Sequence, residues 1–142
     1  MRLTVKQIVE IAQDLEAGMK IFINRENLEI RTILDWDDMY GDNGIWQEEL
    51  EKIQYEWAEY VVITKMESSE AFEIMEAFVD EVQDKRLHED LVKILNRRSP
   101  FANFKAEVES SLYRQEWFDF RLNKFIDYVK DQLESERIEF EE

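Results

Sequence analysis

Only three glycines and one proline interrupt this chain of 142 residues, and their scarcity restricts the folds open to it. Glycine and proline punctuate turns, so a chain with so few of them favours long regular elements over the short strands and frequent turns of a sandwich. Hydrophobic residues make up 44% of the sequence and aromatic residues 13%, which is enough to build a core. We therefore expect a single domain, residues 1–142.

The first expected element is a helix. Thr4 and Gln7 have the spacing of a capping box, and Gly18 sits where such a helix would end. Apolar residues recur between these signals at intervals of three and four, which predicts one buried face. The residues expected on that face are Val5, Ile8, Ala12 and Leu15.

A small antiparallel sheet is expected next. Alternating apolar residues predict a β-hairpin over residues 19–34, with its link at 24–27 and Asn27 in the left-handed conformation. The β-branched run at residues 60–64 predicts a third strand in the same sheet.

The remaining apolar periodicity is helical. It predicts a helix at about residues 46–57 and four helices after the third strand, the last of them starting near Tyr113. Pro100 would occupy the first position of the third of these four helices. The expected N-caps of the first three are Ser68 or Ser69, Asp84 and Ser99.

The fold class is therefore α+β, mainly helical, with helices packed against one face and end of the sheet. The polar residues 135–142 predict a frayed tail.

An acidic segment, residues 35–44, separates the hairpin from the next helix and is expected to be a mobile loop. Its carboxylates resemble a calcium site, but an EF-hand loop needs oxygen ligands at positions one, three and five and glycine at six. Placing Gly41 or Gly44 at position six puts Trp36 or Met39 at position one. A solvated acidic loop is the better interpretation, with a divalent site as the alternative.

Charge and composition exclude several classes of protein. Thirty-four acidic and eighteen basic side chains give a net charge of −16, which disfavours direct binding to nucleic acid. The chain has no cysteine, so disulfides and thiolate metal sites are excluded. No secretory signal or run of about 20 apolar residues is present, so we expect a cytoplasmic protein that does not insert into a membrane.

Catalytic, metal-binding and cofactor-binding residues are not predicted. His88 is the only histidine, and no cysteine or nucleophile-elbow serine accompanies it. We expect it to be a surface residue, and no cofactor is implied.

The stretch Arg97–Arg121 concentrates aromatic and basic side chains in an otherwise acidic chain. Residues 97–130 carry seven bases and five acids, whereas residues 35–59 carry nine acids and one lysine. Phe101, Phe104 and Val108 are expected to share one helix face, with Trp117 at the border of the next helix's apolar stripe.

Two interpretations of this stretch stay open. In the first, its cations pair with the acidic helices and its aromatic residues form core. In the second, the cations and Trp117 flank a groove that binds another protein, because Arg and Trp are enriched at binding hot spots. The residues assigned to that hypothetical groove are Arg97, Arg98, Lys105, Trp117 and Arg121.

Two runs in this stretch resemble a known bacterial family. Pro100-Phe101-Ala102-Asn103-Phe104-Lys105 and Glu116-Trp117-Phe118-Asp119-Phe120-Arg121 are similar to the C-terminal hallmark of uncharacterised protein family 0158. The similarity runs from Ile8 to about Leu133. Members often have a glycine in the turn where this chain has Ser99-Pro100. The resemblance implies a fold but no activity, because none is established for the family.

Three functions are consistent with these features. The first is a non-enzymatic protein-binding or regulatory adaptor domain that uses the aromatic and basic side chains of residues 97–121, with self-association left open. The second is an acidic nucleic-acid mimic that binds a basic protein through residues 35–59 and the C-terminal tail. The third is a metal-dependent hydrolase based on carboxylates.

Overall fold

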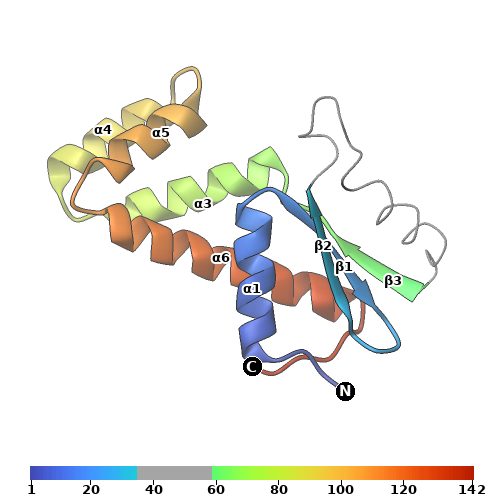
Figure 1. Ribbon diagram of the computed structural model, residues 1–142. Coiled ribbons are helices and arrows are strands. Elements are labelled where there is room, and N and C mark those ends of the chain that lie inside the picture. The colour runs from blue at the N-terminus through green and yellow to red at the C-terminus, as the bar shows by residue number, and fades with distance from the viewer. Residues whose placement is uncertain (35–58) are drawn as a thin grey trace. The chain divides into compact units, whose positions relative to one another are not determined.

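The computed structural model describes residues 1–34 and 59–142, which fall into two compact units (Figure 1). Unit 1 comprises Met1–Lys65 and Phe125–Glu142, and unit 2 comprises Met66–Lys124. The described residues form five helices and a three-stranded antiparallel sheet, which confirms the predicted α+β class. The expected loop at 35–44 and helix at 46–57 lie outside the described residues.

The sheet of unit 1 contains the three predicted strands (Figure 1). β1 (Met19–Asn24) is central and pairs antiparallel with β2 (Ile30–Leu34) and β3 (Tyr60–Ile63). Side chains of β1 alternate between the two faces, and both faces are buried. Phe22 packs on one face with Ile33 and Tyr60. The predicted hairpin and the third strand are thus confirmed.

The hairpin turn differs from the prediction in one residue. Leu28, and not Asn27, has the positive φ, at 59°. The Asn24 side-chain oxygen accepts backbone hydrogen bonds from Glu26 at 2.8 Å and Asn27 at 3.2 Å, which fixes the first half of the turn. The left-handed step therefore falls one residue later, and β2 starts at Ile30.

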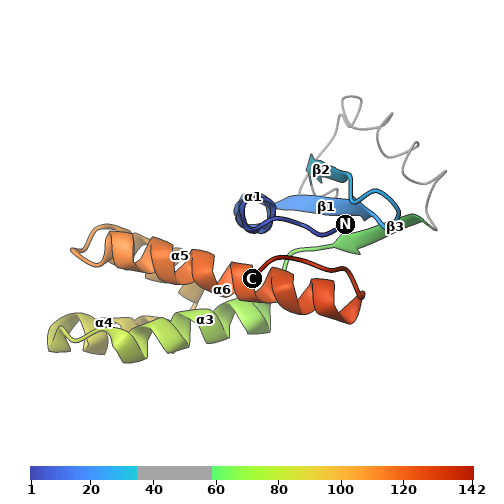
Figure 2. The ribbon, with the colours of Figure 1, turned by 90° about the horizontal axis from the view of Figure 1, so that it is seen from below.

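Helix α1 (Val5–Glu16) packs beside the sheet and appears nearly end-on in Figure 2. The capping box is present, since the Gln7 amide donates to the Thr4 hydroxyl at 3.1 Å and the Thr4 amide donates to the Gln7 side chain at 2.9 Å. Gly18 follows the helix with φ 88°. The buried residues of α1 are Ile8, Ile11, Ala12 and Leu15. Val5 is 48% exposed, contrary to the prediction, because it lies at the helix end and at the border of the buried face.

The C-terminal part of helix α6 (Arg114–Ser135) belongs to unit 1 and ends in a Schellman motif. Arg137 has φ 59°, and the Ile138 amide donates to the Leu133 carbonyl at 2.9 Å. The Arg137 amide donates to the Glu134 carbonyl at 3.1 Å, which completes the motif. The chain therefore reverses direction directly after the helix.

The C-terminal tail pairs with the N-terminus instead of fraying as its composition predicts. The Leu3 amide donates to the Glu139 carbonyl at 3.0 Å, and the Glu141 amide donates to the Leu3 carbonyl at 2.8 Å. Leu3 and Ile138 are buried. Two apolar side chains and a backbone pair thus stabilise a segment that is otherwise polar.

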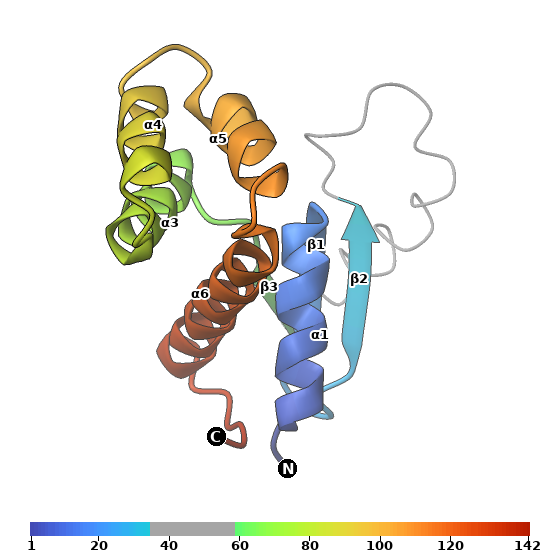
Figure 3. The same cartoon turned by 90° about the vertical axis from the view of Figure 1, so that its left-hand side faces the viewer.

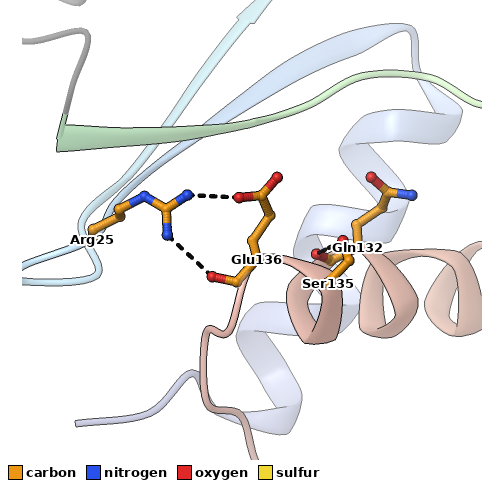
Figure 4. A network of polar contacts seen from close by, with 4 residues as sticks. All are labelled: Arg25, Gln132, Ser135 and Glu136. Carbon is orange, nitrogen blue, oxygen red and sulfur yellow. Dashed lines mark hydrogen bonds and ion pairs between the residues drawn. The ribbon is translucent and has the colours of Figure 1, made fainter.

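Arg25 joins the hairpin turn to the end of α6 (Figure 4). Its Nη1 donates to the Glu136 carbonyl oxygen at 3.1 Å, and its Nη2 donates to the Glu136 carboxylate at 2.6 Å. The guanidinium therefore satisfies a carbonyl at the negative end of the helix as well as forming an ion pair.

Unit 2 consists of α3 (Ser68–Glu81), α4 (Lys85–Leu95), α5 (Pro100–Glu109) and the N-terminal part of α6. Asp84 caps α4 as predicted, because its side chain accepts from the Leu87 amide at 3.0 Å. The N-cap of α3 is Glu67, without a side-chain hydrogen bond, so the predicted Ser68 or Ser69 cap is wrong. Both serines lie inside the first turn.

The core of unit 2 is built around aromatic rings. Phe78 lies at its centre, with its ring centroid 5.1 Å from Trp117, 6.5 Å from Phe104 and 5.4 Å from Phe120. Edge-on ring pairs of this kind stabilise a core beyond the area they bury. The buried members of the cluster are Met75, Phe78, Val79, Val82, Leu91, Phe104, Val108 and Trp117.

Candidate functional site

Trp117, which was expected at the border of an apolar stripe, is a core residue. It is 6% exposed and stacks edge-on against Phe78 and Phe104. The reason is that α6 presents this position to α3 and α5 within unit 2. Trp117 is therefore too little exposed to contact a partner, and we exclude it from the predicted groove.

The cations of residues 97–124 divide into two groups. Arg114 lies over the Phe118 ring at 5.3 Å, and Lys124 lies over the Phe120 ring at 5.4 Å. Arg121 is half-buried and already interacts within the protein. We therefore interpret Arg114, Lys124 and Arg121 as structural cations and not as residues that bind a partner.

Arg97, Arg98 and Lys105 form the second group. All three are exposed, and within residues 1–34 and 59–142 none of them makes an ion pair. The sequence around them contains no acid from Leu91 to Ala106, although the whole chain has 34. Three exposed cations without an ion pair among the described residues thus lie in a strongly acidic protein.

Phe101 joins these cations on the surface. It is 44% exposed, and its ring leans edge-on against Phe72 with the centroids 6.4 Å apart. Lys105 follows it by one helical turn, so the two side chains lie on the same side of α5. We call the set Arg97, Arg98, Phe101 and Lys105 the α5 patch.

Hydrogen bonds to backbone carbonyls fix the geometry of the α4–α5 turn, which contains the two arginines (Figure 3). The Arg97 amide donates to the Ile94 carbonyl at 3.2 Å, and the Asn103 side chain donates to the Arg98 carbonyl at 3.1 Å. Ser99 is the N-cap of α5, as predicted, but it has φ 52° and no side-chain cap. The turn is held by Asn103 and Pro100 and not by the expected serine hydrogen bond.

Sequence reasoning missed Phe101 as a surface residue because it shares a helical period with the buried Phe104 and Val108. Two signals in the sequence could have identified it. Phe101 is at the start of the helix, where burial is least complete, and the neighbouring Ala102 and Ala106 are small. In the structure both alanines are exposed, on the outer face of α5.

His88 has a structural role. It is half-buried, and its Nδ1 lies 2.9 Å from the Val79 carbonyl oxygen. Because a carbonyl can only accept, Nδ1 is the donor, and the side chain links α4 to the end of α3. His88 was predicted to be a surface residue, and its half-buried side chain shows that this prediction is wrong.

Unit 1 contains an open cleft of about 540 Å³ between α1 and the hairpin. Its acidic side chains are Glu10, Asp14 and Glu29, and the Thr32 hydroxyl donates to Asp14 at 3.4 Å. Among the described residues, no three acidic or histidine side chains are placed to hold a metal ion. Nor does any described helix have the length and apolar character that a bilayer span requires.

The comparisons with known proteins give a family and no activity. Neither curated proteins nor solved structures include a significant match to the chain. The model of "Uncharacterised protein family (UPF0158)" matches residues 34–142, so it includes the α5 patch and all of unit 2. The match begins later than the Ile8 expected from the resemblance, which leaves α1 and β1 outside it. It still covers well over half of the 142 residues, and the chain belongs to the uncharacterised protein family UPF0158.

Proposed function

We propose that this protein is a non-enzymatic, cytoplasmic protein-binding domain that contacts its partner through the α5 patch. The observation that carries the proposal is the exposure of three cations beside a half-exposed phenylalanine. By contrast, Arg25 donates to Glu136 within the fold. Exposed cations that have no ion pair among the described residues are available to another molecule.

The composition of the patch supports a protein as that molecule. Arginine and aromatic residues are enriched at protein interfaces, where the long side chains also contribute apolar area. Nucleic acid carries a charge on every phosphate, so the net charge of −16 repels it more strongly than it repels a peptide with a few acidic residues. His88 is engaged in holding two helices together, which favours a binding role over a catalytic one.

Site-specific photo-crosslinking in cells tests the proposal. A photoreactive amino acid at position 102 lies on the outer face of α5, and the same amino acid at position 83 lies in the α3–α4 connection, at the other end of α4. Both positions are exposed. We expect protein adducts from position 102 and not from position 83. The adduct mass distinguishes a second copy of the chain from another protein.

The double variant Arg97→Glu/Arg98→Glu provides the decisive comparison. Its matched control is Lys85→Glu/Arg86→Glu, which changes the net charge equally on an exposed pair at the start of α4. The proposal predicts that the first variant loses the adducts and the control keeps them. Equal adduct yields in both variants, or no adduct at position 102 in the unchanged protein, would refute it.

A further inference from the structure

We propose that the α5 patch binds an acidic amphipathic helix of a partner protein. This inference rests on the proposed function, and it adds the chemical class and the conformation of the segment that is bound.

Charge complementarity identifies the partner as acidic. The patch contains three exposed cations, and the sequence has no acid between Asp90 and Glu107. None of the three has an ion pair within the described part of the chain, so no internal carboxylate must be displaced before a partner binds. Complementary potentials of this kind favour the right partner and accelerate its association.

The surface itself favours a helical partner over an extended one. An extended peptide is usually recognised by adding a strand to a sheet edge, where free backbone groups pair with it. The interior of an α-helix such as α5 has its backbone groups already hydrogen-bonded. Its outer face offers side chains only, and two of these, Ala102 and Ala106, are small and exposed. A second helix can pack closely against such a face.

The spacing within the patch predicts the spacing in the partner. Phe101 and Lys105 lie one turn apart, and Arg98 precedes the helix by two residues. Arg98 precedes Phe101 by three residues, and Lys105 follows it by four. A partner helix with acids about seven residues apart could therefore face both cations. A leucine or aromatic residue between the acids would cover the exposed part of the Phe101 ring.

A peptide-display selection tests this inference directly. The probe is a library of helical 20-residue peptides with the residues of one face randomised, selected against the full chain. Selected peptides should be enriched in Asp and Glu about two turns apart with an apolar residue between them. A representative selected peptide should shift the amide resonances of residues 97–106 in a titration followed by nuclear magnetic resonance.

Variants and salt then separate the patch from the general charge of the protein. We expect the peptide to bind Arg97→Glu/Arg98→Glu at least about tenfold more weakly and Lys85→Glu/Arg86→Glu within about twofold of the unchanged protein. Raising the salt concentration from 50 to 500 mM should weaken binding severalfold, because exposed charge pairs are screened. Phe101→Ala should weaken binding at both salt concentrations.

The outcomes distinguish the two proposals. If cell adducts form at position 102 but selected peptides are neutral or basic, the acidic-helix inference is wrong and the protein-binding function stands. A single-stranded DNA oligonucleotide that binds the patch more tightly than the acidic peptides would also overturn the inference. Peptides that bind the patch variant as well as the control place the contact elsewhere and contradict both proposals.

Discussion

Arg25 of unit 1 and the two arginines of the α4–α5 turn in unit 2 serve different ends. In unit 1, Arg25 donates to both the backbone and the carboxylate of Glu136, and so connects two distant parts of the sequence. In unit 2, Arg97 and Arg98 are exposed and have no ion pair among the described residues. The chain has almost twice as many acids as bases, so partners for cations are abundant. Position in the fold, and not the supply of carboxylates, decides which cations are used structurally.

The aromatic residues of unit 2 show the same division. Phe78, Phe104 and Trp117 are buried in one cluster, whereas Phe101 keeps 44% of its surface exposed. One short run of sequence can thus mix core residues with surface residues a few positions apart. Substitutions that separate the two classes should differ strongly in their effects on folding.

The largest effect is expected for Trp117→Ala. Removing a fully packed aromatic side chain leaves a cavity, and we expect the free energy of unfolding to fall by about 3–5 kcal/mol. Chemical denaturation followed by circular dichroism measures this loss. The matched substitution Phe101→Ala should cost about 1 kcal/mol or less, because the ring is already half in solvent. Similar losses for both substitutions would contradict the assignment of Trp117 to the core.

Ile138→Ala tests whether the tail is part of the fold. Ile138 is 7% exposed, and its loss should reduce the free energy of unfolding by about 2–3 kcal/mol. The control is Glu139→Ala, since the Glu139 side chain is 74% exposed and its backbone still accepts from Leu3. Thermal unfolding should separate the two variants clearly. Equal stabilities would mean that the tail frays, as its composition alone predicts.

Secondary structure was largely predictable from the sequence, because local signals and tertiary packing agree. The Thr4–Gln7 capping box and Asp84 as a cap both have side chains that act on nearby backbone. The tail was not predictable in this way. Its order comes from Arg137 in a position that usually favours glycine, and from a backbone pair with Leu3 at the other end of the chain.

The candidate site was predicted only in part. Arg97, Arg98 and Lys105 lie where the sequence indicated, on the surface of one cationic stretch. Trp117 was misplaced because helical periodicity assigns a face and not the depth to which a neighbouring helix covers it. Phe101 was missed for the opposite reason. Its spacing from Phe104 and Val108 is that of a core residue, but no neighbouring element covers this end of α5 completely.

A smaller effect is expected for Arg25→Ala, which removes both bonds to Glu136. Both side chains are more than two-fifths exposed, at 45% and 42%, so solvent screening reduces the stabilisation from this pair. We expect a loss of about 1 kcal/mol, and less at high salt. Arg2→Ala is the control, because its pair with Glu139 is longer, at 4.0 Å, and more exposed. An equal effect of the two substitutions would show that Arg25 does not act as a helix cap.

Ser99→Gly should stabilise the protein slightly. Ser99 has φ 52°, a conformation that glycine adopts without the steric cost of a Cβ. We expect a net gain of about 0.5 kcal/mol after the greater chain entropy of glycine in the unfolded state is subtracted. At Ser110, where φ is −90°, the same substitution should destabilise the protein. A gain at Ser110 or a loss at Ser99 would contradict this account of the turn.

The smallest effect on folding is expected for the triple variant Arg97→Ala/Arg98→Ala/Lys105→Ala. Its three side chains make no ion pair within the described residues, so their removal breaks no internal contact of that kind. We expect the free energy of unfolding to change by no more than about 0.5 kcal/mol, as for other exposed surface positions. Chemical denaturation with the Arg25→Ala variant measured in parallel gives the comparison. A loss larger than that of Arg25→Ala would make the patch cations structural, and the contrast between the two units would disappear. An unchanged stability together with lost partner binding is the result that only a functional surface produces.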